Sequence, residues 1–175
     1  MGAVGSPVAV EALDRMDAAQ FASAVGPLFE DAPGYLGLLA AARPFATWEM
    51  LFERAETIAL SAPTPIQDEL LAAHPRIGAP PGAVSSLSYR EQGYDREQQE
   101  AITALGPLND AYEARFGFRY VIFVAGRPRS AIVPLLERAL AQGADAERDR
   151  GLRDVVAIAR SRAAAMGMLQ EEATR

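Results

Sequence analysis

Residues 120–124 are Tyr-Val-Ile-Phe-Val and form the only run in the chain with the composition of a β-strand. A single strand has no partner for its backbone hydrogen bonds, so one isolated run cannot build a sheet. We therefore expect residues 120–124 to form an extended, buried segment between helices. The chain is also rich in alanine, which favours helix. These observations predict an all-α protein.

Helix start signals are frequent on both sides of this segment. Three pairs have the spacing of a capping box, namely Asp17 with Gln20, Thr64 with Gln67, and Ser88 with Glu91. Thr47 is an N-cap residue, and Pro33 can occupy a first helical turn. The expected helices cover residues 17–25, 33–42, 47 to beyond 58, 64–73, 88–105 with an interruption near Gly93, 108–116, 130–142 and 145–169. The sequence predicts one domain over residues 1–175, a bundle of about six to eight helices.

Two of these helices have apolar faces that indicate what they bury. In the helix after Thr47, we expect Met50, Leu51 and Ile58 to point inward. The last helix has one apolar stripe at the helical period, made of Leu152, Val155, Val156, Ala159, Ala163 and Met166. Arg162 lies at the edge of that stripe, roughly 65° from its centre. An arginine there either extends outward to solvent or turns inward to hold a carboxylate.

Composition excludes several classes of function. The 175 residues include no cysteine and one histidine, so disulfides, thiolate nucleophiles and two-histidine metal motifs are impossible, and we expect no metal site. The net charge of −6 argues against nucleic-acid binding, which needs clustered basic residues. No apolar run approaches the ~20 residues of a membrane span. We expect a cytoplasmic protein that binds neither nucleic acid nor membrane.

His74 is the one side chain whose ordinary pKa lies near neutrality, so it is the simplest candidate for acid–base chemistry. It follows Leu70 by four residues, which places it on the inward face of its helix. Pro75 then favours an extended conformation at His74. The Pro- and Gly-rich residues 74–87 form a long irregular loop of the kind that is often functional. The alternative is a structural histidine at a helix C-terminus, bonded to a backbone carbonyl.

Glu91 also has two interpretations. As the last member of a capping box it would accept a hydrogen bond from the Ser88 backbone N–H. A carboxylate beside a loop that contains a histidine can equally orient and polarise the imidazole. Ser88 and Gln92 add neutral donors and acceptors on the same turn, which suit a planar ligand rich in amides.

Several ordered motifs resemble those of one enzyme family. They are His74-Pro75-Arg76-Ile77-Gly78, Ser88 with Glu91-Gln92, Leu108-Asn109 with Tyr112 and Phe116-Gly117-Phe118, and Ile158-Ala159 with Arg162. Leu28-Phe29-Glu30 and Arg43-Pro44-Phe45 fit the same pattern. Together they resemble the decarboxylases of 2-oxo-4-hydroxy-4-carboxy-5-ureidoimidazoline (OHCU), which act between urate and allantoin. The resemblance spans almost the whole chain.

The resemblance implies an all-helical, cofactor-independent homodimer. Its small-molecule substrate would come from urate oxidation, and it would release carbon dioxide and (S)-allantoin. His74 would be the catalytic imidazole, Glu91 its acidic partner and Arg162 a cationic group in the site. The positions that would contact substrate are Pro75, Ser88, Tyr89, Arg90, Gln92, Tyr120, Val121, Ile122, Phe123 and Val124. The chain departs from the family at Tyr120, where phenylalanine is usual, and this change can alter the polarity of the pocket.

The substrate's own conjugated C=N can accept the electron pair left by carbon dioxide, so no cofactor is expected. Two alternatives remain open from the sequence. A related enzyme would act on another ureido or imidazoline acid with the same three residues. A helical binding module without enzymatic activity would not bring His74, Glu91 and Arg162 together.

Overall fold

The computed structural model describes residues 9–79 and 99–169, with the backbone alone for 99–102. Within these ranges there are eight α-helices, one 3₁₀ turn and no strand, which confirms the all-α prediction. The elements are α1 (Val10–Arg15), α2 (Ala18–Val25), η1 (Gly26–Leu28), α3 (Pro33–Ala41), α4 (Trp48–Ser61), α5 (Thr64–Ala73), α7 (Gln99–Phe116), α8 (Arg129–Ala139) and α9 (Ala144–Ala165). No described helix is both long and apolar enough to cross a membrane.

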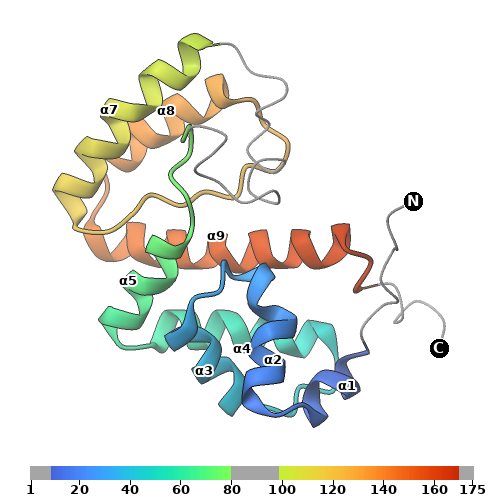
Figure 1. Cartoon of the computed structure of the whole chain (residues 1–175). Helices are drawn as coiled ribbons and strands as arrows, with labels where there is room; N and C mark the ends of the chain where they lie inside the picture. Colours follow the sequence, from blue (N-terminus) through green and yellow to red (C-terminus); the bar gives the residue numbers. More distant parts are fainter. Residues whose placement is uncertain (1–8, 80–98, 170–175) are drawn as a thin grey trace.

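The long helix α9 runs through the middle of the molecule (Figure 1). It packs against α4, α5 and η1 on one side, where α1 to α4 form a group. The pair α7 and α8 lies on the other side, and α5 leads from one group toward the other (Figure 1). The segment between α7 and α8, residues 117–128, runs alongside α9. α9 therefore supports both halves of the fold.

The apolar stripe predicted on α9 is buried from Leu152 to Ala163, and Met166 is the exception at 40% exposed. Met166 lies past the last helical residue because α9 ends at Ala165 rather than Leu169. Gly167 adopts a positive φ of 74°, and Met168 N–H donates to the Ala163 carbonyl at 2.9 Å. This is the Schellman ending, in which a left-handed glycine terminates the helix.

The helix starts are partly as predicted. Asp17 and Gln20 form the predicted capping box, and Thr47 Oγ1 accepts from the Met50 N–H at 3.1 Å. α5 covers the predicted 64–73, but the cap predicted at Thr64 is wrong, because Thr64 is already helical and makes no cap bond. Gln67 Nε2 instead donates to the carbonyls of Ala59 and Leu60 at the end of α4. Gln67 thus joins two helices.

Two further predictions are corrected. Met50 points outward and is 51% exposed, since the buried face of α4 is formed by Trp48, Leu51, Phe52, Ala55 and Ala59. Ile58 is half-buried. The chain does not break between 105 and 108, because α7 continues through Pro107. Leu105, Asn109 and Tyr112 are buried on one face of α7, and that packing outweighs the helix-breaking effect of the proline.

Residues 120–124 form the predicted extended, buried segment. They belong to neither helix nor strand, and Tyr120, Val121 and Val124 are each no more than 5% exposed. Backbone carbonyls of this segment accept hydrogen bonds from arginine side chains and not from a neighbouring strand. Arg150 donates to Val121 O, and Arg127 donates to Phe123 O and Val124 O.

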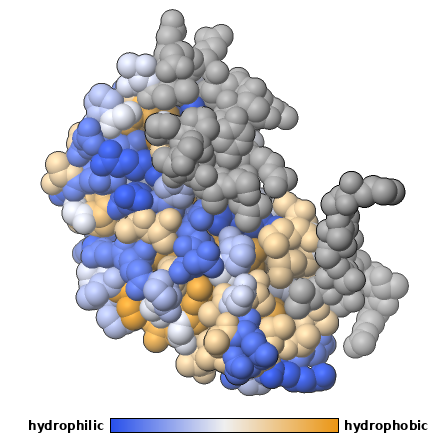
Figure 2. Space-filling view, in the orientation of Figure 1, coloured by the Kyte–Doolittle hydropathy of each residue, from blue (hydrophilic) through white to orange (hydrophobic). Residues whose placement is uncertain are grey.

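The surface differs between the two groups of helices. On the face in Figure 2, hydrophilic residues cover much of the region of α5 and α7, whereas hydrophilic and apolar residues mix over α1 to α4. Ion pairs connect α5 with α7, since Arg76, which follows α5, pairs with Asp110 and Glu113 of α7. These pairs hold the chain after α5 against α7.

Candidate active site

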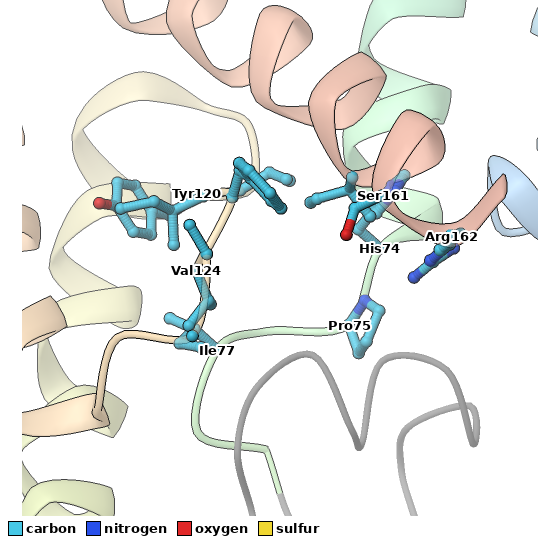
Figure 3. A pocket seen from close by; sticks show the side chains of 13 residues that line it. His74, Pro75, Ile77, Tyr120, Val124, Ser161 and Arg162 are labelled. Atoms are coloured by element: carbon cyan, nitrogen blue, oxygen red, sulfur yellow. The ribbon is translucent and has the colours of Figure 1, made fainter. Parts of the chain in front are cut away.

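A cavity of about 190 Å³ lies where the end of α5, the segment 120–126 and α9 meet (Figure 3). The residues that line it are His74, Pro75, Ile77, residues 120–126, Ile158, Ser161 and Arg162. Its wall is mostly apolar, and the polar side chains among the lining residues include the His74 imidazole, the Ser161 hydroxyl and the Arg162 guanidinium. Such a site can exclude water from a small ligand and present a few polar groups to it.

His74 is the C-cap residue of α5, where Pro75 holds it in an extended conformation (φ −75°, ψ 135°). Its Nδ1 lies 3.0 Å from the Leu70 carbonyl oxygen. A carbonyl only accepts, so Nδ1 is the donor and the lone pair of the neutral ring is on Nε2. Nε2 is buried and has no hydrogen-bond partner among the described residues. His74 therefore makes the carbonyl bond predicted for a structural histidine, and it also lines the cavity.

The His74 ring is neutral at pH 7. Burial lowers its pKa to about 4, because desolvation disfavours the imidazolium. The charges of Arg162 and Arg119 also lower this pKa, while the Leu70 carbonyl and Glu30 act in the opposite direction. The Nε2 lone pair of His74 is therefore unprotonated near neutral pH.

The backbone around His74 is held by residues outside the predicted site. Arg119 donates to the carbonyls of Ala72 and His74 at 2.7 and 2.8 Å, so it satisfies two of the free carbonyls at the end of α5. Asn109 Nδ2 donates to the Ile77 carbonyl at 2.9 Å. Sequence reasoning missed Arg119, and its place directly before the 120–124 run was the only available signal.

The same stretch requires a glycine at position 78. Gly78 has a φ of 81°, and a Cβ at this position would lie 3.1 Å from Leu105. A larger residue would be strained by both the backbone and the contact.

Arg162 turns inward, which decides between its two predicted orientations. The residue is 2% exposed, and its Nη1 donates to the carbonyls of Pro27 and Leu28 at 3.0 and 3.3 Å. Its Nη2 donates to Glu30 Oε1 at 2.7 Å. The carboxylate expected beside an inward arginine is thus Glu30. The family motifs included Glu30, but its pairing with Arg162 was missed because the two are far apart in sequence.

Segment 120–124 faces the cavity along its length, but the Tyr120 ring does not project toward His74 (Figure 3). That ring packs edge-on against Tyr112, with centroids 5.0 Å apart, and Arg150 lies over its face. The hydroxyl that distinguishes Tyr120 from phenylalanine points away from Arg162 (Figure 3). We therefore expect this departure to affect the packing behind the wall more than the polarity of the cavity.

The structure brings part of the predicted site together. His74, Pro75, Arg162 and residues 120–124 line one cavity. The other predicted residues, Ser88, Tyr89, Arg90, Glu91 and Gln92, lie outside the described residues, so their roles remain predictions. Within the described ranges, no three His, Asp or Glu side chains are grouped so that they could hold a metal ion.

These features define an all-helical protein with a neutral imidazole and a paired guanidinium at one small cavity. Residues 14–164 match the family model described as OHCU decarboxylase. This match covers most of the chain, and the protein therefore belongs to the OHCU decarboxylase family.

Individual relatives agree with this assignment. The chain is 28% identical over 153 residues to a 2-oxo-4-hydroxy-4-carboxy-5-ureidoimidazoline decarboxylase of Halalkalicoccus jeotgali, covering 86% of each. It is 30% identical over 155 residues to the uric acid degradation bifunctional protein PucL of Bacillus subtilis. That alignment covers 87% of this chain, which spans only 31% of the length of the bifunctional protein.

Two solved structures share the fold at 20% identity. A crystal structure of OHCU decarboxylase in the presence of (S)-allantoin gives a TM-score of 0.64, covering 78% of this chain and 92% of its own. A crystal structure of (S)-allantoin synthase gives a TM-score of 0.66, and the alignment covers 91% of this chain and 54% of the synthase chain. At this identity the likeness concerns the fold.

Proposed function

We propose that this protein decarboxylates OHCU to (S)-allantoin in urate degradation, with His74 as its proton carrier. Family membership supports the reaction. The observation that supports the role of His74 is its fixed tautomer. The Nδ1 proton is donated to the Leu70 carbonyl, so the lone pair is on Nε2, and His74 lines the cavity. A neutral imidazole in this state can accept a proton and return it.

The chemistry divides between substrate and protein. When the bond to the carboxylate breaks, carbon dioxide leaves and the electron pair enters the substrate's conjugated C=N. His74 Nε2 takes the proton of the adjacent hydroxyl, which becomes the carbonyl of the product. The resulting imidazolium then gives a proton to one face of the carbanion-like intermediate, and the ring nitrogen that accepted the electron pair takes a proton from solvent. Delivery from one side of the cavity sets the handedness of allantoin.

The rest of the cavity wall binds and orients the substrate. The Arg162 guanidinium lies where it can stabilise negative charge that develops on a substrate oxygen. Backbone groups of residues 120–124 are suited to bond the ring and ureido amides, because the side chains of Arg150 and Arg127 hold this segment in place. In this proposal Glu91 orients the imidazole, and Ser88 and Gln92 complete the amide contacts.

Circular dichroism during enzymatic urate oxidation tests the proposed reaction. Adding this protein should produce optically active (S)-allantoin rapidly, whereas urate oxidase alone should give slow, racemic product. Equal traces with and without the protein would contradict the proposal. The homodimer and the cytoplasmic location also stay proposals, which light scattering and cell fractionation check.

A further inference from the structure

A buried ion pair at the cavity wall joins two distant parts of the chain. Arg162 of α9 lies 2.7 Å from Glu30, and their side chains are 1% and 14% exposed. Glu30 is in the loop between η1 and α3, and the neighbouring Pro27 and Leu28 offer their carbonyls to the same guanidinium. Three acceptors from residues 27–30 thus surround the end of Arg162.

The loop reaches this arrangement through an unusual backbone. Glu30 and the next residue, Asp31, have φ angles of 52° and 56°, in the left-handed region that non-glycine residues rarely adopt. The Gly26 carbonyl accepts from the N–H groups of both Phe29 and Asp31 at 2.9 Å, which closes the turn. Left-handed residues other than glycine persist where surrounding structure compensates for them, and they concentrate at functional sites. Here the turn directs the Glu30 carboxylate to Arg162.

The pair also sets the charge around the imidazole. Among the residues that the structure describes, Arg162, Glu30 and Arg119 are the charged groups that act on His74, two positive and one negative. Glu30 is thus the one acidic group among them, and it touches the guanidinium that lines the cavity. Without Glu30, the buried charge of Arg162 would lose this carboxylate and the fixed orientation that the contact gives.

We propose that Glu30 is a positioning residue of this active site, which fixes the Arg162 guanidinium at the cavity wall and balances its charge beside His74. This inference rests on the proposed function and adds a role for a residue that does not itself line the cavity. Glu30 acts through Arg162. Its loss should therefore reduce turnover more than substrate affinity.

Two substitutions separate the effect of the Glu30 charge from the effect of its side-chain length. Glu30→Gln keeps an acceptor oxygen and removes the charge, and Glu30→Asp keeps the charge but withdraws it by one methylene. We expect kcat to fall about 10- to 100-fold in Glu30→Gln and less in Glu30→Asp, with KM within threefold of the parent, because small misplacements of a catalytic group cost up to about this much. Far-UV circular dichroism establishes that each variant is folded.

Glu49→Gln is the matched control. Glu49 also pairs with an arginine of α9, because Arg160 Nη2 lies 2.8 Å from Glu49 Oε1, but that pair is exposed and outside the cavity. This variant should retain the parental kcat.

A second readout does not depend on activity. The guanidinium N–H signals of Arg162 in nuclear magnetic resonance, identified by their absence in Arg162→Gln, should be sharp and separate in the parent. They should broaden or merge in Glu30→Gln. These signals test the positioning role even if the parent has no activity on OHCU, which would overturn the proposed function instead.

A folded Glu30→Gln variant with parental kcat and parental Arg162 signals would overturn the inference. The inference would also be overturned if Glu30→Asp is folded and its kcat is no higher than that of Glu30→Gln. If Glu30→Gln does not fold, parental kcat and parental Arg162 signals in Glu30→Asp would overturn it.

Discussion

At the scale of single residues, His74 combines a fixed tautomer with a position on the cavity wall. The Leu70 carbonyl fixes the proton on Nδ1, and burial keeps the ring neutral. From the sequence, the carbonyl bond and a role in the site were alternatives for His74; the bond is present, and the same residue lines the cavity. The sequence did not predict the partner of Arg162, because a helical wheel shows which residues are at the core edge but not which distant loop meets them.

The lowered pKa of His74 predicts how stability depends on pH. The unfolded chain binds this proton below about pH 6.5, whereas the folded protein binds it only below about pH 4. The contribution to stability is therefore complete above pH 6.5 and is lost as pH falls from there to 4, by about 3 kcal/mol. Urea unfolding of the parent and of His74→Asn between pH 4 and 7.5 measures this loss of stability. Parallel pH dependences in the two proteins would contradict the buried, neutral ring.

At the scale of elements, the end of α5 determines where the imidazole lies. Caps and apolar spacing predicted this helix from 64 to 73, and the structure agrees. The helix break predicted near Pro107 is wrong, because local propensity does not include the packing of Leu105 and Tyr112 against the core. The cap predicted at Thr64 is wrong as well, since the polar side chain of Gln67 bonds to the preceding helix.

Arg119 provides a test at this scale. Arg119→Met leaves the Ala72 and His74 carbonyls without their side-chain donor, so we expect a loss of about 2 kcal/mol in the free energy of unfolding. We also expect kcat to fall about tenfold, because the His74 backbone is less well held. Arg115→Met is the control, as its bond to the Gln142 carbonyl is exposed and long at 3.4 Å. Equal stability and activity in the two variants would show that Arg119 does not position His74.

At the scale of the whole molecule, one site depends on three distant regions that meet along α9. The end of α5 and segment 120–124 form two walls of the cavity, and the loop at residues 27–30 holds Arg162 from the other group of helices. The sequence predicted most of the helices and most of the described lining, but not α1. It could not predict this convergence from spacing, because the contacts join residues far apart in the chain. The ordered family motifs supplied that expectation instead.

A ligand that occupies this cavity should stabilise the whole fold. Binding to the native state alone adds about 2.7 kcal/mol at a ligand concentration of 100 times Kd. For a chain of this size we expect Tm to rise by roughly 5–10 °C. (S)-Allantoin should produce this shift in a thermal melt, and (R)-allantoin at the same concentration should produce a smaller one. Equal shifts for the two enantiomers would contradict a handed site.

In the proposed function, His74 transfers the proton that makes allantoin formation fast and stereospecific. The most direct measurement is circular dichroism of urate oxidation with the parent protein and with folded His74→Asn, whose amide can still donate to the Leu70 carbonyl. We expect rapid formation of (S)-allantoin by the parent and a rate about 10² to 10⁴ times lower with the variant. Formation of (S)-allantoin by His74→Asn at the parental rate would contradict the proposed role of His74.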